Sequence, residues 1–129
     1  MKFDFIECSE PVEIEGVRLA VANAGIRGRS RNDVVLVELV PGAQTAAVFT
    51  QNKFCAAPVI VARENIAARQ PKFLVFNSGN ANAGTGTLGI EHARKVICGL
   101  ADIQGCSSAE IMPFSTGVIG ERLNYKKII

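Results

Sequence analysis

The chain has 129 residues, of which 48% are hydrophobic and 20% charged, so it fits one domain with a buried core. Its 14 basic and 12 acidic residues leave a net charge of +2, which gives no electrostatic reason to expect nucleic acid or an anionic membrane as a partner. Asp4 interrupts the apolar start that a secretory signal would need, and no apolar run approaches the ~18 residues of a membrane span. We therefore expect a cytoplasmic protein.

The four cysteines are Cys8, Cys55, Cys98 and Cys106, and in that compartment we expect them to be reduced. Their spacings match no zinc pattern, and the single histidine cannot complete a mixed site, so no metal or other cofactor is expected. Cys98 falls on a predicted helical apolar face, where we expect it to be in the core.

The first half of the chain predicts two strands, a hairpin and a helix. The segment 17–22 is apolar-rich, and 34–40 is β-branched and ends at a Pro-Gly turn pair. We expect the segment 45–50 to be the second arm of a hairpin across that turn. The segment 58–68 opens with proline and predicts a helix. Between the two strands lies a basic cluster, which we interpret as a solvated loop: Arg27, Arg29 and Arg31.

In the second half, 73–76 predicts a short buried strand and 89–103 the strongest helix of the chain, with an apolar stripe at helical spacing. The segment 111–115 predicts another strand, preceded by Ser107 and Glu110 at capping-box spacing. Asn124 is expected to begin a further helix, which stops after about one turn. Alternating strands and helices predict an α/β fold, α+β layered, with a mixed sheet and flanking helices over residues 1–129 as a single domain.

Two clusters of small polar residues and glycine follow the apolar runs of the second half, at 77–83 and 115–120. Hydroxyls, amides and bare backbone N–H groups at a sheet edge can stabilise a developing negative charge without supplying a charge. Thr116 and Gly117 could form such an oxyanion hole, or they could simply make a turn. Asn80 and Asn82 could position an amide substrate, although a tight loop held by their side chains is the interpretation that we favour.

A nucleophile and its base are missing from the sequence pattern. His92 falls in the predicted helix beside Glu91 and off its apolar stripe, which indicates a position on the flank of that helix. No Gly-x-Ser-x-Gly elbow is present, and no cysteine has an identifiable base partner. Serine or cysteine hydrolysis by this chain alone is therefore not expected.

The segment Gly84–Gly89 satisfies the pattern G-x-G-x-x-G and leaves a second hypothesis open, a non-catalytic nucleotide-binding α/β module. Dinucleotide sites require the glycine turn directly after the strand, so that the pyrophosphate meets the helix N-terminus. Here the five residues 79–83 separate the strand from Gly84. The acidic residue expected after the next strand is also missing.

Four blocks in the same order resemble the N-terminal part of ornithine acetyltransferase, the bifunctional glutamate N-acetyltransferase family of arginine biosynthesis. They are Val48-Phe49-Thr50 with Asn52, Ala56-Ala57-Pro58-Val59, the run from Asn77 to Ala83, and Ser115 to Gly120. The resemblance extends from about Gly16 to the end of the chain. One departure is Gly84, where this family commonly has cysteine.

This resemblance implies a ping-pong acyl transfer in which acetyl passes from N-acetylornithine to an enzyme threonine and then to glutamate; some members also use acetyl-CoA as donor. It implies that Thr116 and Gly117 form the oxyanion hole. The nucleophilic threonine of the family is freed by self-cleavage within a Lys-Gly-Ser-Gly-Met…Ala-Thr-Met stretch, and nothing like that stretch occurs in these 129 residues. The resemblance therefore implies that this chain is an N-terminal fragment of an α chain, inactive alone. Its implied partner is a β chain that carries the nucleophile, in an α2β2 assembly.

Overall fold

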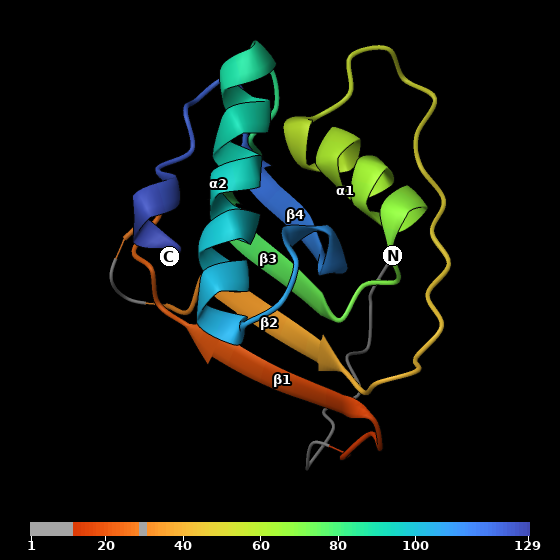
Figure 1. Ribbon diagram of the computed structural model, residues 1–129. Helices are drawn as coiled ribbons and strands as arrows, with labels where there is room; N and C mark the ends of the chain where they lie inside the picture. The colour runs from red at the N-terminus through yellow and green to blue at the C-terminus, as the bar shows by residue number, and fades with distance from the viewer. Residues whose placement is uncertain (1–11, 29–30) are drawn as a thin grey trace, which may run out of the picture.

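The computed structural model describes residues 12–28 and 31–129, which form a mixed sheet with two helices on one face (Figure 1). The four strands are β1 (Val17–Ala22), β2 (Val34–Leu39), β3 (Phe73–Asn80) and β4 (Ile111–Val118), and they lie in that order across the sheet. β1 and β3 are antiparallel to β2, whereas β4 is parallel to β3. The fold class expected from the sequence is confirmed.

The two helices are α1 (Ala57–Ala68) and α2 (Gly86–Gln104). Pro58 lies in the first turn of α1, where its missing N–H leaves no hydrogen bond unmade. α2 connects the parallel strands β3 and β4, and it ends at Gly105, whose φ of 63° is the left-handed conformation that commonly terminates a helix. Both helices agree with the sequence expectation, except that α2 begins three residues earlier.

The core lies between the helices and one face of the sheet. Val75 and Ile111 point from the sheet toward Val61 of α1 and Ile97 of α2, and all four are at most 6% exposed. The amide of Asn65 on α1 donates to the carbonyl of Ile111 at 2.7 Å, which fixes the helix to the start of β4. Burial of these apolar side chains stabilises the layer arrangement.

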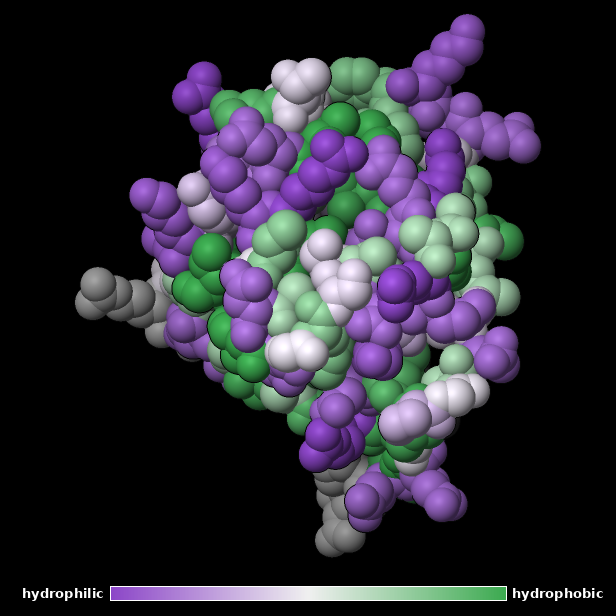
Figure 2. Space-filling model, in the orientation of Figure 1, coloured by the Kyte–Doolittle hydropathy of each residue, from purple (hydrophilic) through white to green (hydrophobic). Residues whose placement is uncertain are grey.

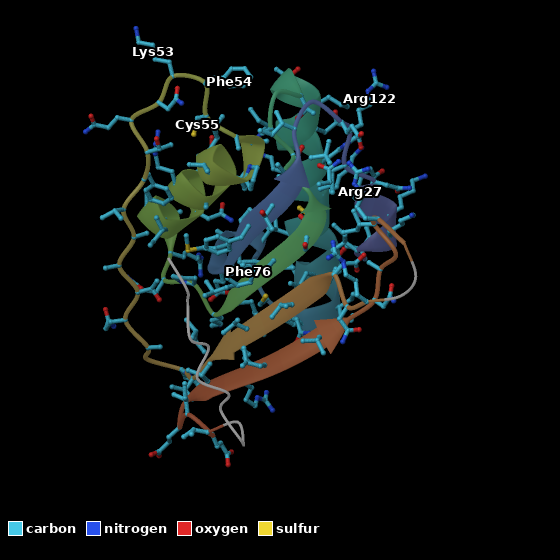
Figure 3. The ribbon with its side chains drawn as sticks, turned by 180° about the vertical axis from the view of Figure 1, so that it is seen from behind. Arg27, Lys53, Phe54, Cys55, Phe76 and Arg122 are labelled. Carbon is cyan, nitrogen blue, oxygen red and sulfur yellow. The ribbon has the colours of Figure 1, made fainter. Side chains whose placement is uncertain are left out.

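The opposite face of the sheet carries apolar side chains, and no helix of residues 12–28 and 31–129 covers it. Alternation along the strands places Leu19, Phe76 and Phe114 on this face, and Leu19 is 69% exposed. The rings of Phe76 and Phe114 stack with their centroids 4.4 Å apart. Figure 3 views this face, with Phe76 at its middle, whereas the helix-covered face in Figure 2 is a mixture of hydrophilic and hydrophobic side chains.

Several expectations were wrong. No hairpin forms across Pro41 and Gly42, because β1 and β3 occupy both edges of β2, and the segment 43–50 is neither helix nor strand. The expected C-terminal helix is a single 3-10 turn, Tyr125–Lys127, and Asn124 makes no side-chain cap to it. Cys98 is exposed on α2, not in the core. Cys8 and Arg29 lie outside the described residues.

The capping box at Ser107 and Glu110 is present, and it precedes a 3-10 turn, Ser108–Glu110, that leads into β4. Neither described helix combines the length and the apolar character needed to cross a membrane. Across residues 12–28 and 31–129, we find no group of three or more His, Cys, Asp or Glu side chains placed to hold a metal ion.

Candidate active site

Thr116 and Gly117 lie in β4, near its C-terminal end, and not in a turn. They pair with Ser78 and Gly79 of β3, and both are exposed. The strand continues through Gly117 because glycine also occupies the opposing position, so that the two backbones can approach closely. The C-terminal ends of the two parallel strands therefore meet at this point, which is where ligands commonly bind in open parallel sheets.

Gly117 has a conformation and surroundings that only glycine fits. Its φ is 130°, and a β-carbon placed on it would lie 2.5 Å from the backbone nitrogen of Asn80, closer still to the carbonyl carbon of Gly79. The flat Gly79–Asn80 peptide thus occupies the space of the missing side chain. The requirement for glycine here comes from this close approach between two strands.

The two candidate donors lie on exposed sides of β4, the Gly117 N–H at its free edge and the Thr116 side chain on the uncovered face. Proline has no N–H, so Pro113 is tolerated only where its nitrogen faces away from β3, at the edge of the sheet. Strand alternation directs the N–H of Gly117 to the same free edge. The Thr116 side chain lies on the uncovered face with Phe114. A hydroxyl and a backbone N–H at one exposed corner can both donate to the same oxygen.

The asparagines that precede this corner have internal partners. The Asn77 amide accepts from the Ser115 hydroxyl at 2.6 Å and donates to the carbonyl of Asn80 at 2.8 Å. The Asn80 side chain accepts from the backbone N–H of Asn82 and donates to the carbonyl of Glu121. Asn77 and Asn80 are themselves strand residues, which the sequence placed in a loop. These hydrogen bonds fit a structural role for the amides. They join β3 to β4 and to the residues that follow β4.

Asn82 is fully buried and has a φ of 47°, which asparagine tolerates better than most residues. Its amide donates to the carbonyl of Gly89 at 2.9 Å and accepts from the hydroxyl of Thr85. This side chain therefore fills the inside of the glycine-rich segment that begins α2. The ring of Phe54 lies 3.4 Å from the place of a β-carbon on Gly84, the position where the family pattern commonly has cysteine.

A pocket of about 490 Å³ lies beside β4. Its walls are the segment 45–50, the first turns of α1, and β4 as far as Ser115, the residue before Thr116. The lining residues are mostly apolar, and the few polar ones are Thr45, Thr50 and Ser115. The segment expected as a hairpin arm is therefore a pocket wall, and the pocket ends next to the candidate donors.

His92 has the flanking position that its sequence predicts. It is half-buried on α2, its ring lies 5.0 Å from that of Tyr125, and its buried Nδ1 has no hydrogen-bond partner among the described residues. It therefore contacts the C-terminal 3-10 turn.

The sequence interpretation missed one side chain at this end of the sheet. Arg27 donates from Nε to the carbonyl of Gly79 at 2.8 Å and pairs with Glu121 at 2.9 Å. It is labelled in Figure 3, near the C-terminal end of β3. Arg27 and Arg31 are both exposed loop residues, as expected, but the sequence pattern did not indicate the contacts that Arg27 makes with Gly79 and Glu121.

Comparisons with known proteins agree with these features. The model of the ArgJ family matches residues 18–129. The arginine biosynthesis bifunctional protein ArgJ of Methylococcus capsulatus is 53% identical over 115 residues, which are 89% of this chain and 28% of that protein. The protein of the same name from Psychrobacter arcticus is 49% identical over 116 residues, 90% of this chain and again 28% of the relative. The chain thus spans less than a third of these curated relatives.

Two solved structures are also similar. The crystal structure of arginine biosynthesis bifunctional protein argJ from Bacillus halodurans superimposes with a TM-score of 0.82 at 34% identity, over 88% of this chain and 60% of that one. Ornithine acetyltransferase from Mycobacterium tuberculosis, crystallised with ornithine, gives a TM-score of 0.80 at 32% identity, over 88% of this chain and 62% of that one.

Proposed function

The chain belongs to the ArgJ family, and from that premise we propose that the protein containing it transfers acetyl from N-acetylornithine to glutamate, with acetyl-CoA as a second donor. In this reaction Thr116 and Gly117 stabilise the oxyanion. The observation that carries this assignment is their position at the exposed C-terminal end of β4, beside a pocket that ends at Ser115.

The reaction needs hydrogen-bond donors placed at one atom, the carbonyl oxygen of the acetyl group. A threonine hydroxyl attacks the acetyl carbonyl carbon of N-acetylornithine, a C–O bond forms, and the carbonyl oxygen becomes negative. Collapse breaks the C–N bond, and ornithine leaves after its nitrogen takes a proton. The amine of glutamate then attacks the acetyl-threonine through a second oxyanion and restores the hydroxyl. Fixed donors stabilise both oxyanions without reorganising.

The attacking threonine belongs to a part of the protein outside these 129 residues, on a partner β chain produced by self-cleavage, in an α2β2 assembly. Its new α-amino group, with an unperturbed pKa of about 8, can serve as the base. The lengths of the relatives support two chains. The match covers 28% of the Methylococcus capsulatus protein but 60% of the crystallised Bacillus halodurans chain. Since the matched segments are of similar length, the crystallised chain is about half as long as the curated protein.

Substitution of Thr116 in the full-length protein tests the assignment. Thr116→Val keeps the branched shape but removes the hydroxyl, and we expect kcat to fall roughly 100-fold or more, because one oxyanion donor is lost. Thr116→Ser keeps the hydroxyl and should retain most of the activity. Thr87→Val, at an exposed threonine of α2, is the matched control.

The rate must be normalised to the cleaved fraction, measured by gel, because self-cleavage passes through a similar oxyanion. A Thr116→Val protein that is fully cleaved and turns over at the wild-type rate would refute the oxyanion role.

A further inference from the structure

Arg27 is held in a fixed loop, although it is distant in sequence from the candidate site. The loop follows β1, and the carboxylate of Asp33, which is only 4% exposed, accepts from the backbone N–H groups of Ala24 and Ile26 at 2.7 and 2.6 Å. These two hydrogen bonds fix the backbone immediately before Arg27. Its side chain, 39% exposed, then extends across the end of β3.

The guanidinium group and the stem of Arg27 both contact Gly79. Nε donates to the Gly79 carbonyl, and a β-carbon placed on Gly79 would lie 2.6 Å from Cγ of Arg27. The second interaction of the guanidinium is the ion pair with Glu121, whose own backbone carbonyl accepts from the Asn80 side chain. Both interactions of the guanidinium group are thus with groups of the protein, and they direct Arg27 toward the end of β3.

The carbonyl that Arg27 holds belongs to the peptide that packs against Gly117. This Gly79–Asn80 peptide fills the space that a side chain at Gly117 would need. A rotation of the peptide would therefore displace Gly117 and redirect its N–H. The next carbonyl along β3, that of Asn80, is held in turn by Asn77. Of these two carbonyls, the one that Arg27 holds belongs to the peptide that lies closest to Gly117.

We propose that Arg27 is a positioning residue for the oxyanion site: its Nε–H holds the Gly79–Asn80 peptide in the orientation that directs the Gly117 N–H toward the reacting oxygen. The inference rests on the proposed function of Thr116 and Gly117. A donor that is misplaced by a fraction of an ångström stabilises the transition state less, and the ground state of the substrate is affected little. Loss of Arg27 should therefore lower kcat and leave KM nearly unchanged.

Two substitutions in the full-length, self-cleaved protein separate this role from others. Arg27→Met keeps the aliphatic stem against Gly79 but has no donor. Arg27→Lys keeps the charge for Glu121 but places no N–H at the Nε position. We expect both to lower kcat by roughly ten- to a hundredfold, with KM within about twofold of wild type. Arg122→Met is the matched control, an exposed arginine at the same end of the sheet (Figure 3), and should keep the wild-type kcat.

Glu121→Gln gives a further control, because it removes the ion pair and leaves the hydrogen bond to Gly79; it should retain most of kcat. Wild-type kcat in Arg27→Lys would show that the charge matters and not the Nε donor, and would overturn the inference. A rise in KM at constant kcat would overturn it as well, by showing contact with substrate. A lower Tm of the Arg27 variants, with an unchanged kcat per folded molecule, would also overturn the inference, because it would show a role in stability alone.

Thr116→Val, measured in parallel, separates the two proposals. If it lowers kcat and Arg27→Met does not, only the positioning role of Arg27 fails. If Thr116→Val itself has the wild-type kcat, the oxyanion assignment fails whatever Arg27 does.

Discussion

At the scale of single residues, Gly117 and Gly79 face each other across β3 and β4 without a side chain between them. The residue types and the family resemblance suggested Thr116 and Gly117 as oxyanion donors, and both residues are exposed in the structure. Their strand conformation could not be predicted, because it depends on a glycine 38 positions earlier. The contacts of Arg27 were missed for a related reason, because its acceptor is 52 residues away in the sequence.

Alanine substitution at two glycines tests the close approach of the strands. Gly120 also has a positive φ, 81°, but no atom of the described part of the chain lies within 4 Å of a β-carbon placed there. Gly120→Ala should therefore cost about 1–2 kcal/mol of unfolding free energy, from backbone strain alone. Gly117→Ala adds a collision with the Gly79–Asn80 peptide, and overpacking of this kind typically costs a further 1–3 kcal/mol.

Urea denaturation of both variants measures this difference in unfolding free energy. Equal losses at the two positions would show that β3 does not approach Gly117 as closely as described.

At the scale of secondary structure, local composition predicted the elements better than their partners. The β-branched run of β2 and the apolar stripe of α2 each indicate one conformation strongly, and both elements are present. The Pro41-Gly42 turn pair suggested a hairpin, but β2 is an inner strand between β1 and β3. Pairing of this kind is decided by the whole sheet, which a local pattern does not contain.

The carboxylate of Glu110, just before β4, makes the stability of the protein depend on pH. Glu110 accepts hydrogen bonds from Lys72 at 2.8 Å and from the Ser107 backbone, and these hold its pKa below the ordinary value of 4.5, the bond from Lys72 most of all. A carboxylate with a lowered pKa in the folded state stabilises the protein above its unfolded pKa. This contribution is lost as the pH falls through the folded pKa.

Wild type should therefore exceed Glu110→Gln in Tm at neutral pH, and the difference should shrink below about pH 4.5. Glu13→Gln, at an exposed glutamate, is the control. A Tm difference between wild type and Glu110→Gln that stays constant between pH 7 and pH 3 would contradict this account of the ion pair.

At the scale of the whole molecule, the helices cover one face of the sheet, and the other face exposes apolar side chains such as Leu19 and Val21. The candidate donors lie at the end of the strands on this uncovered side. Together with a chain that spans 28% of its curated relatives, this arrangement fits a site completed by further polypeptide. That the nucleophile lies on another polypeptide stays a prediction of the sequence resemblance, because the family's nucleophile motif is absent from these residues.

The central claim is that this chain supplies oxyanion donors to a nucleophile located elsewhere. The most direct test is to incubate the full-length, self-cleaved protein with N-acetylornithine labelled in its acetyl group, without glutamate, and to locate the trapped acetyl group by peptide mass spectrometry. The account predicts acetyl on a threonine outside these 129 residues, formed more slowly in Thr116→Val. Acetyl found on Thr116, or on any other residue of this chain, would contradict it.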